Sequence, residues 1–171
     1  MATARPRIVL IGMMGSGKTA VGHILSRRTG WPYLDNDDLV EGASGRTARD
    51  LSHAGTAELR RAERQALMRG MEAPRPVIIG AAAGVVLDPT VTGLLRDSFV
   101  VWLRASPATL AARSAGGAHR PWLEGDSLSW LREADAGRAP GYRALASIEV
   151  DTDVLTPDQV ADAIMAAMPR E

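Results

Sequence analysis

A glycine-rich stretch near the amino terminus carries the residue types that bind phosphate. Residues 12–19 read GMMGSGKT, which has the spacing G-x-x-x-x-G-K-[ST] of a phosphate-binding loop. Glycines let the backbone amides of such a loop converge on an anion, and the positive end of a helix that begins there adds to the attraction. We expect Lys18 to reach the terminal phosphates of a nucleotide and the Thr19 hydroxyl to bind Mg²⁺.

The segments on either side of this loop have the patterns that such a site requires. Residues 8–11, IVLI, are a short apolar run typical of a buried strand, and residues 18–29 have apolar side chains at helical spacing. The alternative is a chance glycine-rich turn, which average residue frequencies produce in roughly one chain in a hundred of this length. A strand before the loop and a helix after it lower that chance further, so the sequence predicts nucleotide binding.

Two aspartates, Asp35 and Asp37, follow a second short apolar segment, residues 31–34. Spaced two apart at the end of a strand, both can project from the same rim. One carboxylate there could hold Mg²⁺ or its waters, and the other could accept the proton of a hydroxyl and hold an acceptor in line. The alternative is that these aspartates, with Asp38, cap the following helix. We assign the cap to Asp38 and the chemistry to Asp35 and Asp37.

Arginines form the second group of residues that could serve phosphoryl transfer. Arg60 and Arg61 lie on a predicted long helix, Arg113 lies at a helix end, Arg120 lies in a glycine-rich loop, and Arg138 precedes a Pro-Gly pair. Phosphoryl transfer gains mainly from positioning and charge stabilisation, and an arginine on a loop could close over the transferring group. Most arginines are simply solvated, so the sequence pattern by itself selects none of them.

The elements that must position these residues alternate between strand and helix. Such alternation predicts an α/β fold with a parallel sheet covered by helices on both faces, and ligands bind at the carboxyl ends of such strands. This places residues 12–19, Asp35, Asp37 and residues 81–84 around one crevice. The remaining strands are predicted at 77–80, 99–103 and 147–150, and further helices at 39–45, 47–53, 56–71, 89–96, 107–114, 128–135 and 157–168.

Composition narrows the classes of function. The chain has 171 residues, and we expect residues 1–171 to form one domain with a substantial core. Twenty basic residues balance twenty acidic ones, so no overall field favours nucleic acid or an anionic membrane as a partner. The absence of cysteine excludes disulfides and thiolate zinc sites. The first residues do not read as a secretory signal and no stretch is long enough to cross a membrane, so we expect a cytoplasmic protein.

Over nearly its whole length the chain resembles the shikimate kinases. Residues 12–19 match the family's G-x-M-G-x-G-K-[ST], and residues 35–37, DND, match its D-x-D after the second strand. The family's G-E-x-x-F-R-x-x-E reads GTAELRRAE at residues 55–63. The lid motif R-P-L stands as RPWL at residues 120–123, and R-x-P-x-Y reads RAPGY at residues 138–142.

The resemblance implies the three-layer fold of P-loop kinases, with a five-stranded parallel sheet of order 2-3-1-4-5, a mobile lid loop at about residues 115–125 and a monomer. It implies an ATP-dependent kinase that moves the γ-phosphoryl group to a hydroxyl of a small carboxylated polyol, with shikimate as the first choice. It also implies Mg²⁺ as a cofactor and a role in aromatic amino acid biosynthesis.

On the nucleotide side, the resemblance implies that Lys18 and Arg120 hold the ATP phosphates and the transferring group. Thr19 and Asp35 would serve Mg²⁺, and Arg113 would lie near the adenine. The full set expected to bind ATP is Gly15, Ser16, Gly17, Lys18, Thr19, Ala20, Arg113 and Arg120.

On the acceptor side, Asp37 would bind the hydroxyls of the acceptor and could act as the base. Arg60 and Arg138 would pair with its carboxylate, where two guanidinium forks give orientation as well as charge. The expected catalytic residues are therefore Lys18, Asp37 and Arg120.

The chain departs from the family on this acceptor side. Where the family has three glycines whose amides meet shikimate, this chain has Ala82, Ala83 and Gly84, which we still expect to line the acceptor. An alanine in place of a glycine at positive φ would cost roughly 1 kcal/mol or more. Thr56 replaces the motif's glutamate and Leu59 its phenylalanine. Two explanations stay open: neutral drift, or an acceptor that is smaller or differently hydroxylated than shikimate.

Two other functions are consistent with the sequence, and a third, a nucleic-acid-dependent ATPase, is disfavoured by the zero net charge and the small size. One is a kinase of the same fold for another small polyol or hydroxy acid, and the other is a nucleotide-binding regulatory protein without catalysis. The joint presence of Lys18, Thr19, Asp35, Asp37 and Arg120 argues against the second, because a protein that only binds a nucleotide needs neither an acceptor aspartate nor a lid arginine.

Overall fold

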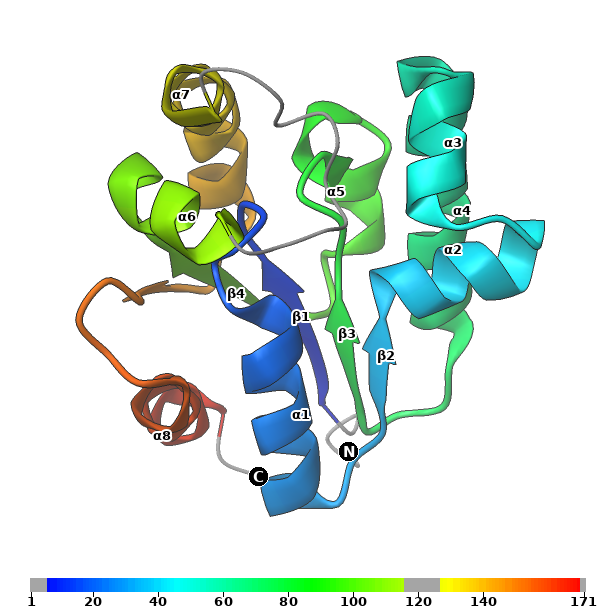
Figure 1. Ribbon diagram of the computed structural model, residues 1–171. Helices are drawn as coiled ribbons and strands as arrows, with labels where there is room; N and C mark the ends of the chain where they lie inside the picture. Colours follow the sequence, from blue (N-terminus) through cyan, green and yellow to red (C-terminus); the bar gives the residue numbers. More distant parts are fainter. Residues whose placement is uncertain (1–5, 116–126, 170–171) are drawn as a thin grey trace.

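The computed structural model describes residues 6–115 and 127–169, which build a five-stranded parallel sheet with helices on both faces (Figure 1). The strand order is β2-β3-β1-β4-β5, which confirms the predicted order. The strands are β1 (Arg7–Ile11), β2 (Tyr33–Asp35), β3 (Val77–Gly80), β4 (Phe99–Arg104) and β5 (Ile148–Asp151). The helices are α1 (Lys18–Thr29), α2 (Asn36–Ser44), α3 (Ala48–Ala54), α4 (Thr56–Glu72), the 3-10 turn η1 (Val85–Leu87), α5 (Val91–Leu94), α6 (Pro107–Ser114), α7 (Ser127–Leu145) and α8 (Pro157–Ala167).

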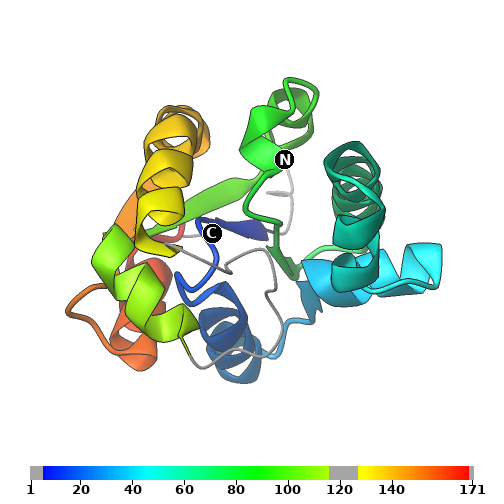
Figure 2. The same ribbon diagram turned by 45° about the horizontal axis from the view of Figure 1, so that its top comes forward.

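Alternate residues of the central strands face two separate cores. Ile8 and Leu10 of β1 pack in one core with side chains from α1 and α8. Val9 and Ile11 pack in the other with side chains from α4 and α7. Figure 2 shows α1 and α8 on one side of the sheet and α5 and α7 on the other. Because both faces are covered, the strands read in the sequence as continuous apolar runs rather than as alternating ones.

Most helix boundaries follow local signals in the sequence. Gly30 ends α1 in the left-handed conformation. Thr47 and Thr156 begin α3 and α8 with capping boxes, in which the cap residue and the third helical residue satisfy each other's amides. Ser106 caps α6, and Pro107 occupies its first turn. The predicted positions of these helices are therefore confirmed to within one or two residues.

Helix α7 is longer than the sequence indicated. The prediction ended it near residue 135 and treated residues 138–142 as a separate segment, but α7 continues through Pro140 to Leu145. Proline removes one amide donor, yet Pro140 and the turn before it at Ala136 are exposed, so water can satisfy the carbonyl that loses its partner. Although α7 has 19 residues, no helix in the described ranges has the apolar length needed to cross a bilayer.

The segment after β3 also differs from the prediction. The helix expected at 89–96 is reduced to α5, Val91–Leu94, and Pro89 lies before it rather than in its first turn. The carboxylate of Asp88 accepts hydrogen bonds from the amide and hydroxyl of Thr90, and this local turn delays the start of the helix.

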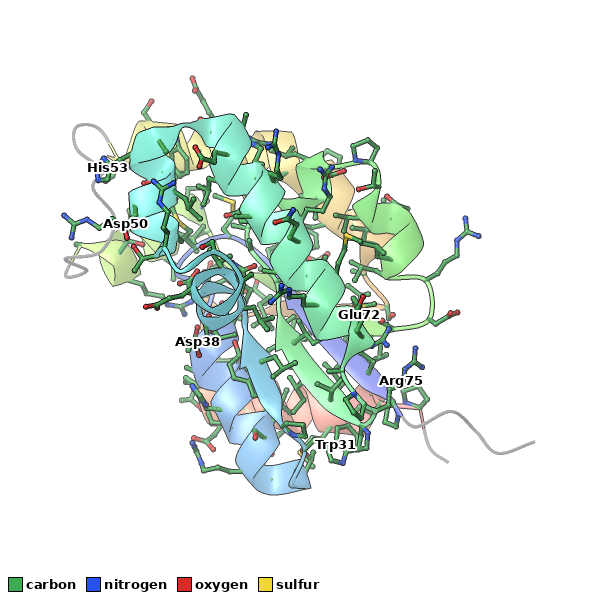
Figure 3. The ribbon with its side chains drawn as sticks, turned by 90° about the vertical axis from the view of Figure 1, so that its right-hand side faces the viewer. Trp31, Asp38, Asp50, His53, Glu72 and Arg75 are labelled. Carbon is green, nitrogen blue, oxygen red and sulfur yellow. The ribbon has the colours of Figure 1, made fainter. Side chains whose placement is uncertain are left out.

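Helices α2, α3 and α4 pack on one another beside β2 and form a lobe, residues 36–72, which joins the main core through Leu67 of α4. Figure 3 shows α4 crossing this side of the molecule, with Asp50 and His53 near one end and Glu72 and Arg75 at the other. Because Arg75 leads directly into β3, the opposite end of α4 lies at the carboxyl edge of the sheet. The lobe thus faces the edge where a ligand is expected.

Gly12 makes a close approach that leaves no room for a side chain. Its φ is +146°, and a Cβ there would lie 2.4 Å from the carbonyl oxygen of Leu103. We expect Gly12→Ala to lower the free energy of unfolding by about 2 kcal/mol or more, measured by urea denaturation. Gly42→Ala on α2 is the matched control, because its Cβ would meet nothing within 4 Å and helix propensity predicts a gain of about 1 kcal/mol. Equal effects of the two changes would contradict this reading of Gly12.

Candidate functional site

An open groove of about 1530 Å³ runs over the carboxyl ends of β1, β2 and β3. Its walls come from the loop after β1, the junction of β2 and α2, the segment after β3, and parts of α3, α4, α6 and α7. The expected nucleotide and acceptor residues that line it are Gly15, Gly17, Lys18, Thr19, Ala20, Asp35, Asp37, Arg60, Ala82, Ala83, Gly84, Arg113 and Arg138. The structure therefore brings both predicted half-sites into one groove.

Two expected residues are not among these lining side chains. Ser16 is buried beneath the loop, and its hydroxyl has no hydrogen-bond partner among the described residues. Residues 116–126, which include Arg120 and nearly all of the expected lid, lie outside the described residues.

The loop before α1 has the form of an anion site. The Nζ of Lys18 donates to the carbonyl oxygens of Gly12 at 2.8 Å and Met13 at 2.9 Å, which folds the side chain back over the loop. The Ser16 amide donates to the same Met13 carbonyl at 3.2 Å and closes a turn. Gly17 is the N-cap of α1 and has no side chain that could accept from the first helical amides, so an anion in the groove can satisfy them.

Thr19 and Asp35 form a pair of oxygen ligands beside this loop. The Thr19 hydroxyl donates to Asp35 Oδ2 at 2.9 Å, and Asp35 Oδ1 accepts the amide of Asp37 at 3.0 Å. Asp35 is therefore also the N-cap of α2, a role that we had assigned to Asp38. Within residues 6–115 and 127–169, no group of three or more His, Cys, Asp or Glu side chains could hold a metal. The pair fits Mg²⁺ that arrives with a nucleotide, since Mg²⁺ commonly takes one or two protein oxygens and completes its shell with phosphate and water.

Arg113 ties the loop to the far edge of the sheet. Its guanidinium donates to the carbonyl of Gly15 at 3.2 Å, and to the hydroxyl and carbonyl of Thr152 at 3.1 and 2.6 Å. Because Thr152 directly follows β5, this one side chain links the phosphate loop to the last strand. Arg113 lines the groove beside the loop, where the resemblance expects the nucleotide base.

The acceptor end of the groove gathers two arginines around a carboxyl group. Arg60 comes from α4 and Arg138 from α7, and both lower the pKa of Glu63 on α4. Burial has the larger, opposite effect, and it raises the pKa of Glu63 to about 7. The nearby charge of Asp37, which is exposed in the groove, raises it further. Two guanidinium groups and the carboxyl groups of Glu63 and Asp37 therefore meet at this end of the groove.

Arg138 is held by an aromatic ring and a sulfur atom. Its guanidinium carbon lies 5.7 Å from the centre of the Trp130 ring, and both residues belong to α7. Its Nη1 lies 3.6 Å from the sulfur of Met13 in the phosphate loop. These contacts, and a further one to the side chain of Tyr142, orient the guanidinium group.

The alanines after β3 carry no backbone strain. Only glycines have positive φ among the described residues, so the cost considered for Ala82 and Ala83 does not arise. The buried hydroxyl of Tyr142 donates to the Ala83 carbonyl at 2.7 Å, and the Tyr142 ring packs on Trp102. This bond from α7 fixes the segment that lines the acceptor end.

Comparison with known proteins agrees with this geometry. The family model described as shikimate kinase matches residues 14–169 of the chain. A shikimate kinase of Symbiobacterium thermophilum is 41% identical over 162 residues, which cover 92% of this chain and 93% of the relative. The chain belongs to the shikimate kinase family. A shikimate kinase of Mycobacterium tuberculosis is 34% identical over 165 residues, covering 95% of this chain and 93% of the relative.

Solved structures support the same family. A shikimate kinase from Acinetobacter baumannii in complex with shikimate superposes with a TM-score of 0.87 at 26% identity, covering 94% of this chain and 91% of that one. A gluconokinase from Sinorhizobium meliloti, with a TM-score of 0.63 at 21% identity over 94% of this chain and 90% of its own, supports the fold alone. Membership of the shikimate kinase family confirms the predicted fold and makes the chain an ATP-dependent small-molecule kinase.

Three residues that the fold places at this site, Glu63, Tyr142 and Trp130, have no role that the sequence alone predicts. Glu63 ends the motif at 55–63 and Tyr142 ends the motif at 138–142, so the motifs contained both, but their contacts depend on the packing of α4 and α7. Trp130 had no sequence signal, because a single aromatic residue in a polar stretch does not indicate what lies beside it.

The raised pKa of Glu63 predicts a pH dependence of stability. The folded protein holds this proton up to about pH 7, whereas the unfolded chain releases it near pH 4.5. The stabilisation is therefore complete below the lower value and is lost as the pH rises through the higher one. Relative to Glu63→Gln, we expect the free energy of unfolding to fall by up to about 3 kcal/mol across this window in urea denaturation.

A control variant separates this effect from the loss of a charge on α4. Glu72→Gln changes an exposed glutamate at the other end of the same helix. If the difference between the parent protein and Glu63→Gln stays constant with pH, or if Glu72→Gln shows the same slope, the burial argument for Glu63 is wrong.

Proposed function

We propose that this member of the shikimate kinase family phosphorylates shikimate, or a small hydroxy acid very close to it, at the expense of ATP. The observation that carries the proposal is that Arg60 and Arg138 face the same groove as the phosphate loop, with Asp37 also lining it. Two guanidinium groups can bind a carboxylate in a defined orientation, which is what a small hydroxy acid needs to present one hydroxyl to the loop. The relative from Acinetobacter baumannii binds shikimate.

On the donor side, Lys18 and the amides of residues 15–20 would hold the ATP phosphates. Thr19 and Asp35 would hold Mg²⁺, which neutralises charge on the β- and γ-phosphates when it is bound. Arg113 would lie beside the nucleotide base, and Arg120 would approach the transferring group. Arg113 already binds the loop carbonyl of Gly15, which supports a role in keeping the donor site in shape.

On the acceptor side, Asp37 would accept the proton of the acceptor's hydroxyl. At the same time the oxygen of that hydroxyl would bond to the γ-phosphorus, and the bond between the γ-phosphorus and ADP would break. The ammonium group of Lys18 would stabilise the negative charge that develops on the transferring phosphoryl group. Arg60 and Arg138 would hold the carboxylate, and the segment of Ala82, Ala83 and Gly84 would form the opposite wall. The bond from Tyr142 to Ala83 supports a preformed wall at this position.

We also propose that residues 1–171 act as one kinase domain, as a monomer, in the cytoplasm where ATP is available. The balance of twenty basic and twenty acidic residues supports a protein without nucleic-acid or membrane partners. A different small hydroxy acid is the second candidate substrate, because the methyl groups of Ala82 and Ala83 stand in the groove wall where the family has glycines.

Measurement of ADP release against a panel of small hydroxy acids and polyols tests this function. We expect shikimate to raise ADP release well above the ATPase background, because its carboxylate engages both arginines. Turnover with another hydroxy acid but not with shikimate would contradict the assignment of shikimate and would favour the second candidate. The variant Ala82→Gly/Ala83→Gly then shows whether the two methyl groups cause that preference.

Arg138→Ala should weaken the binding of an anionic acceptor specifically. A charge-assisted pair contributes about 1.5–3 kcal/mol, so we expect KM for shikimate to rise roughly 10- to 100-fold while KM for ATP changes little. Arg132→Ala is the matched control, since Arg132 is exposed on the same helix and does not line the groove. A rise in KM for ATP equal to that for shikimate would contradict the placement of the acceptor carboxylate at Arg138.

A further inference from the structure

Tyr33, the first residue of β2, places its hydroxyl on the carboxylate of Asp35. Tyr33 Oη donates to Asp35 Oδ2 at 2.9 Å, and Thr19 Oγ1 donates to the same oxygen at 2.9 Å. The other oxygen, Oδ1, accepts the backbone amide of Asp37 at 3.0 Å. A carboxylate offers about four acceptor positions, so these donors occupy three of them and fix its orientation before any ligand binds.

Two glycines make the room that the Tyr33 side chain occupies. A Cβ on Gly22 of α1 would lie 2.2 Å from ring atom Cε2, and a Cβ on Gly80 would lie 2.3 Å from Oη. Gly80 stands opposite Asp35 in the parallel register of β2 and β3. His23 packs against the ring edge to face, with centres 5.0 Å apart. Positions 22, 33 and 80 therefore form one packing unit that determines where the hydroxyl lies.

Packing alone does not account for the hydroxyl. A phenylalanine would fill the space between Gly22 and Gly80 without burying a polar atom, and burial of an unpaired hydroxyl is unfavourable. The Tyr33 hydroxyl is instead paired, since it donates to the Asp35 carboxylate. Its partner at Oδ2 is the same oxygen that Thr19 contacts.

We propose that Tyr33 is a positioning residue that holds the Asp35 carboxylate in the orientation needed to bind Mg²⁺ with the nucleotide. The inference rests on the proposed role of Thr19 and Asp35 as the Mg²⁺ pair. Thr19 must direct a lone pair to the metal, whereas the Tyr33 hydroxyl is held against Gly80 of β3. Donors of this kind commonly set the affinity of a metal site by fixing the orientation of its ligand.

Titration calorimetry of ADP binding, with Mg²⁺ and with a chelator, tests the proposal without reference to turnover. For Tyr33→Phe, we expect ADP affinity in Mg²⁺ to fall about 10-fold while affinity in the chelator is unchanged. Tyr142→Phe is the matched control, because it also removes a hydroxyl bond, to Ala83 at the acceptor end, and should leave the Mg²⁺ dependence intact. An unchanged or stronger response to Mg²⁺ in Tyr33→Phe would overturn the proposal.

The response of the parent protein to Mg²⁺ distinguishes a failure of the proposed Mg²⁺ pair from a failure of the positioning role of Tyr33. If its ADP affinity does not respond to Mg²⁺, the proposed Mg²⁺ pair of Thr19 and Asp35 fails. If the parent responds and Tyr33→Phe responds equally, only the positioning role fails.

Gly80→Ala is a second variant that disturbs the hydrogen bond of the Tyr33 hydroxyl, without changing Tyr33 itself. Its Cβ would collide with Tyr33 Oη, so we expect a loss of Mg²⁺-dependent affinity similar to that of Tyr33→Phe. Because both changes act through one hydrogen bond, the double variant should lose little more than either single variant. Losses that add in full would contradict the coupling of Gly80 to the hydroxyl.

Discussion

The parallel pairing of β1, β2 and β3 is the constraint on which the whole site depends. Leu10 of β1 and Asp35 of β2 both pair with Gly80 of β3, so the three strands end at the same level. Each strand then continues into a segment that lines the groove: the phosphate loop, the start of α2, and the run from Ala81 to Gly84. Residues separated by as many as 70 positions in sequence meet because the strands that carry them run in one direction.

The helices complete the site from two sides. Helix α4 leads into β3 and brings Arg60 and Glu63 to the carboxyl edge of the sheet, and α7 brings Arg138 and Trp130 from the other direction. Both helices pack on the core around Trp102, α4 through Leu67 and α7 through Leu131 and Tyr142, and α4 also packs on α2 and α3. The shared core therefore sets how the two arginines lie relative to each other.

The fold could be predicted from the sequence because its signals are local. Apolar runs mark the strands, and Gly30, Thr47 and Thr156 mark helix ends, so five strands and most helices were predicted in place. The prediction failed where a local signal was outweighed by its surroundings. Pro140 normally ends a helix, but in α7 it lies on the exposed side while Leu131 and Tyr142 are fully buried, and that packing keeps the helix continuous.

The site was predictable as a set of residues but not as a set of contacts. The resemblance to the shikimate kinases implied that Thr19 and Asp35 serve the same Mg²⁺, and the structure joins them by a hydrogen bond. The resemblance could not indicate that Tyr33 shares the same oxygen or that Gly80 makes room for it, because those facts depend on the register of β2 against β3. The strain considered for Ala82 was likewise a question of backbone conformation, which the residue type leaves undetermined.

We propose that one groove carries a phosphoryl group from ATP to shikimate. The most direct test supplies ATP labelled in the γ-phosphoryl group together with saturating shikimate, and follows the label by chromatography. We expect the label to move to shikimate, with inorganic phosphate at the level of a control without protein. Label that stays on ATP, or that appears as inorganic phosphate despite saturating shikimate, would contradict the proposal.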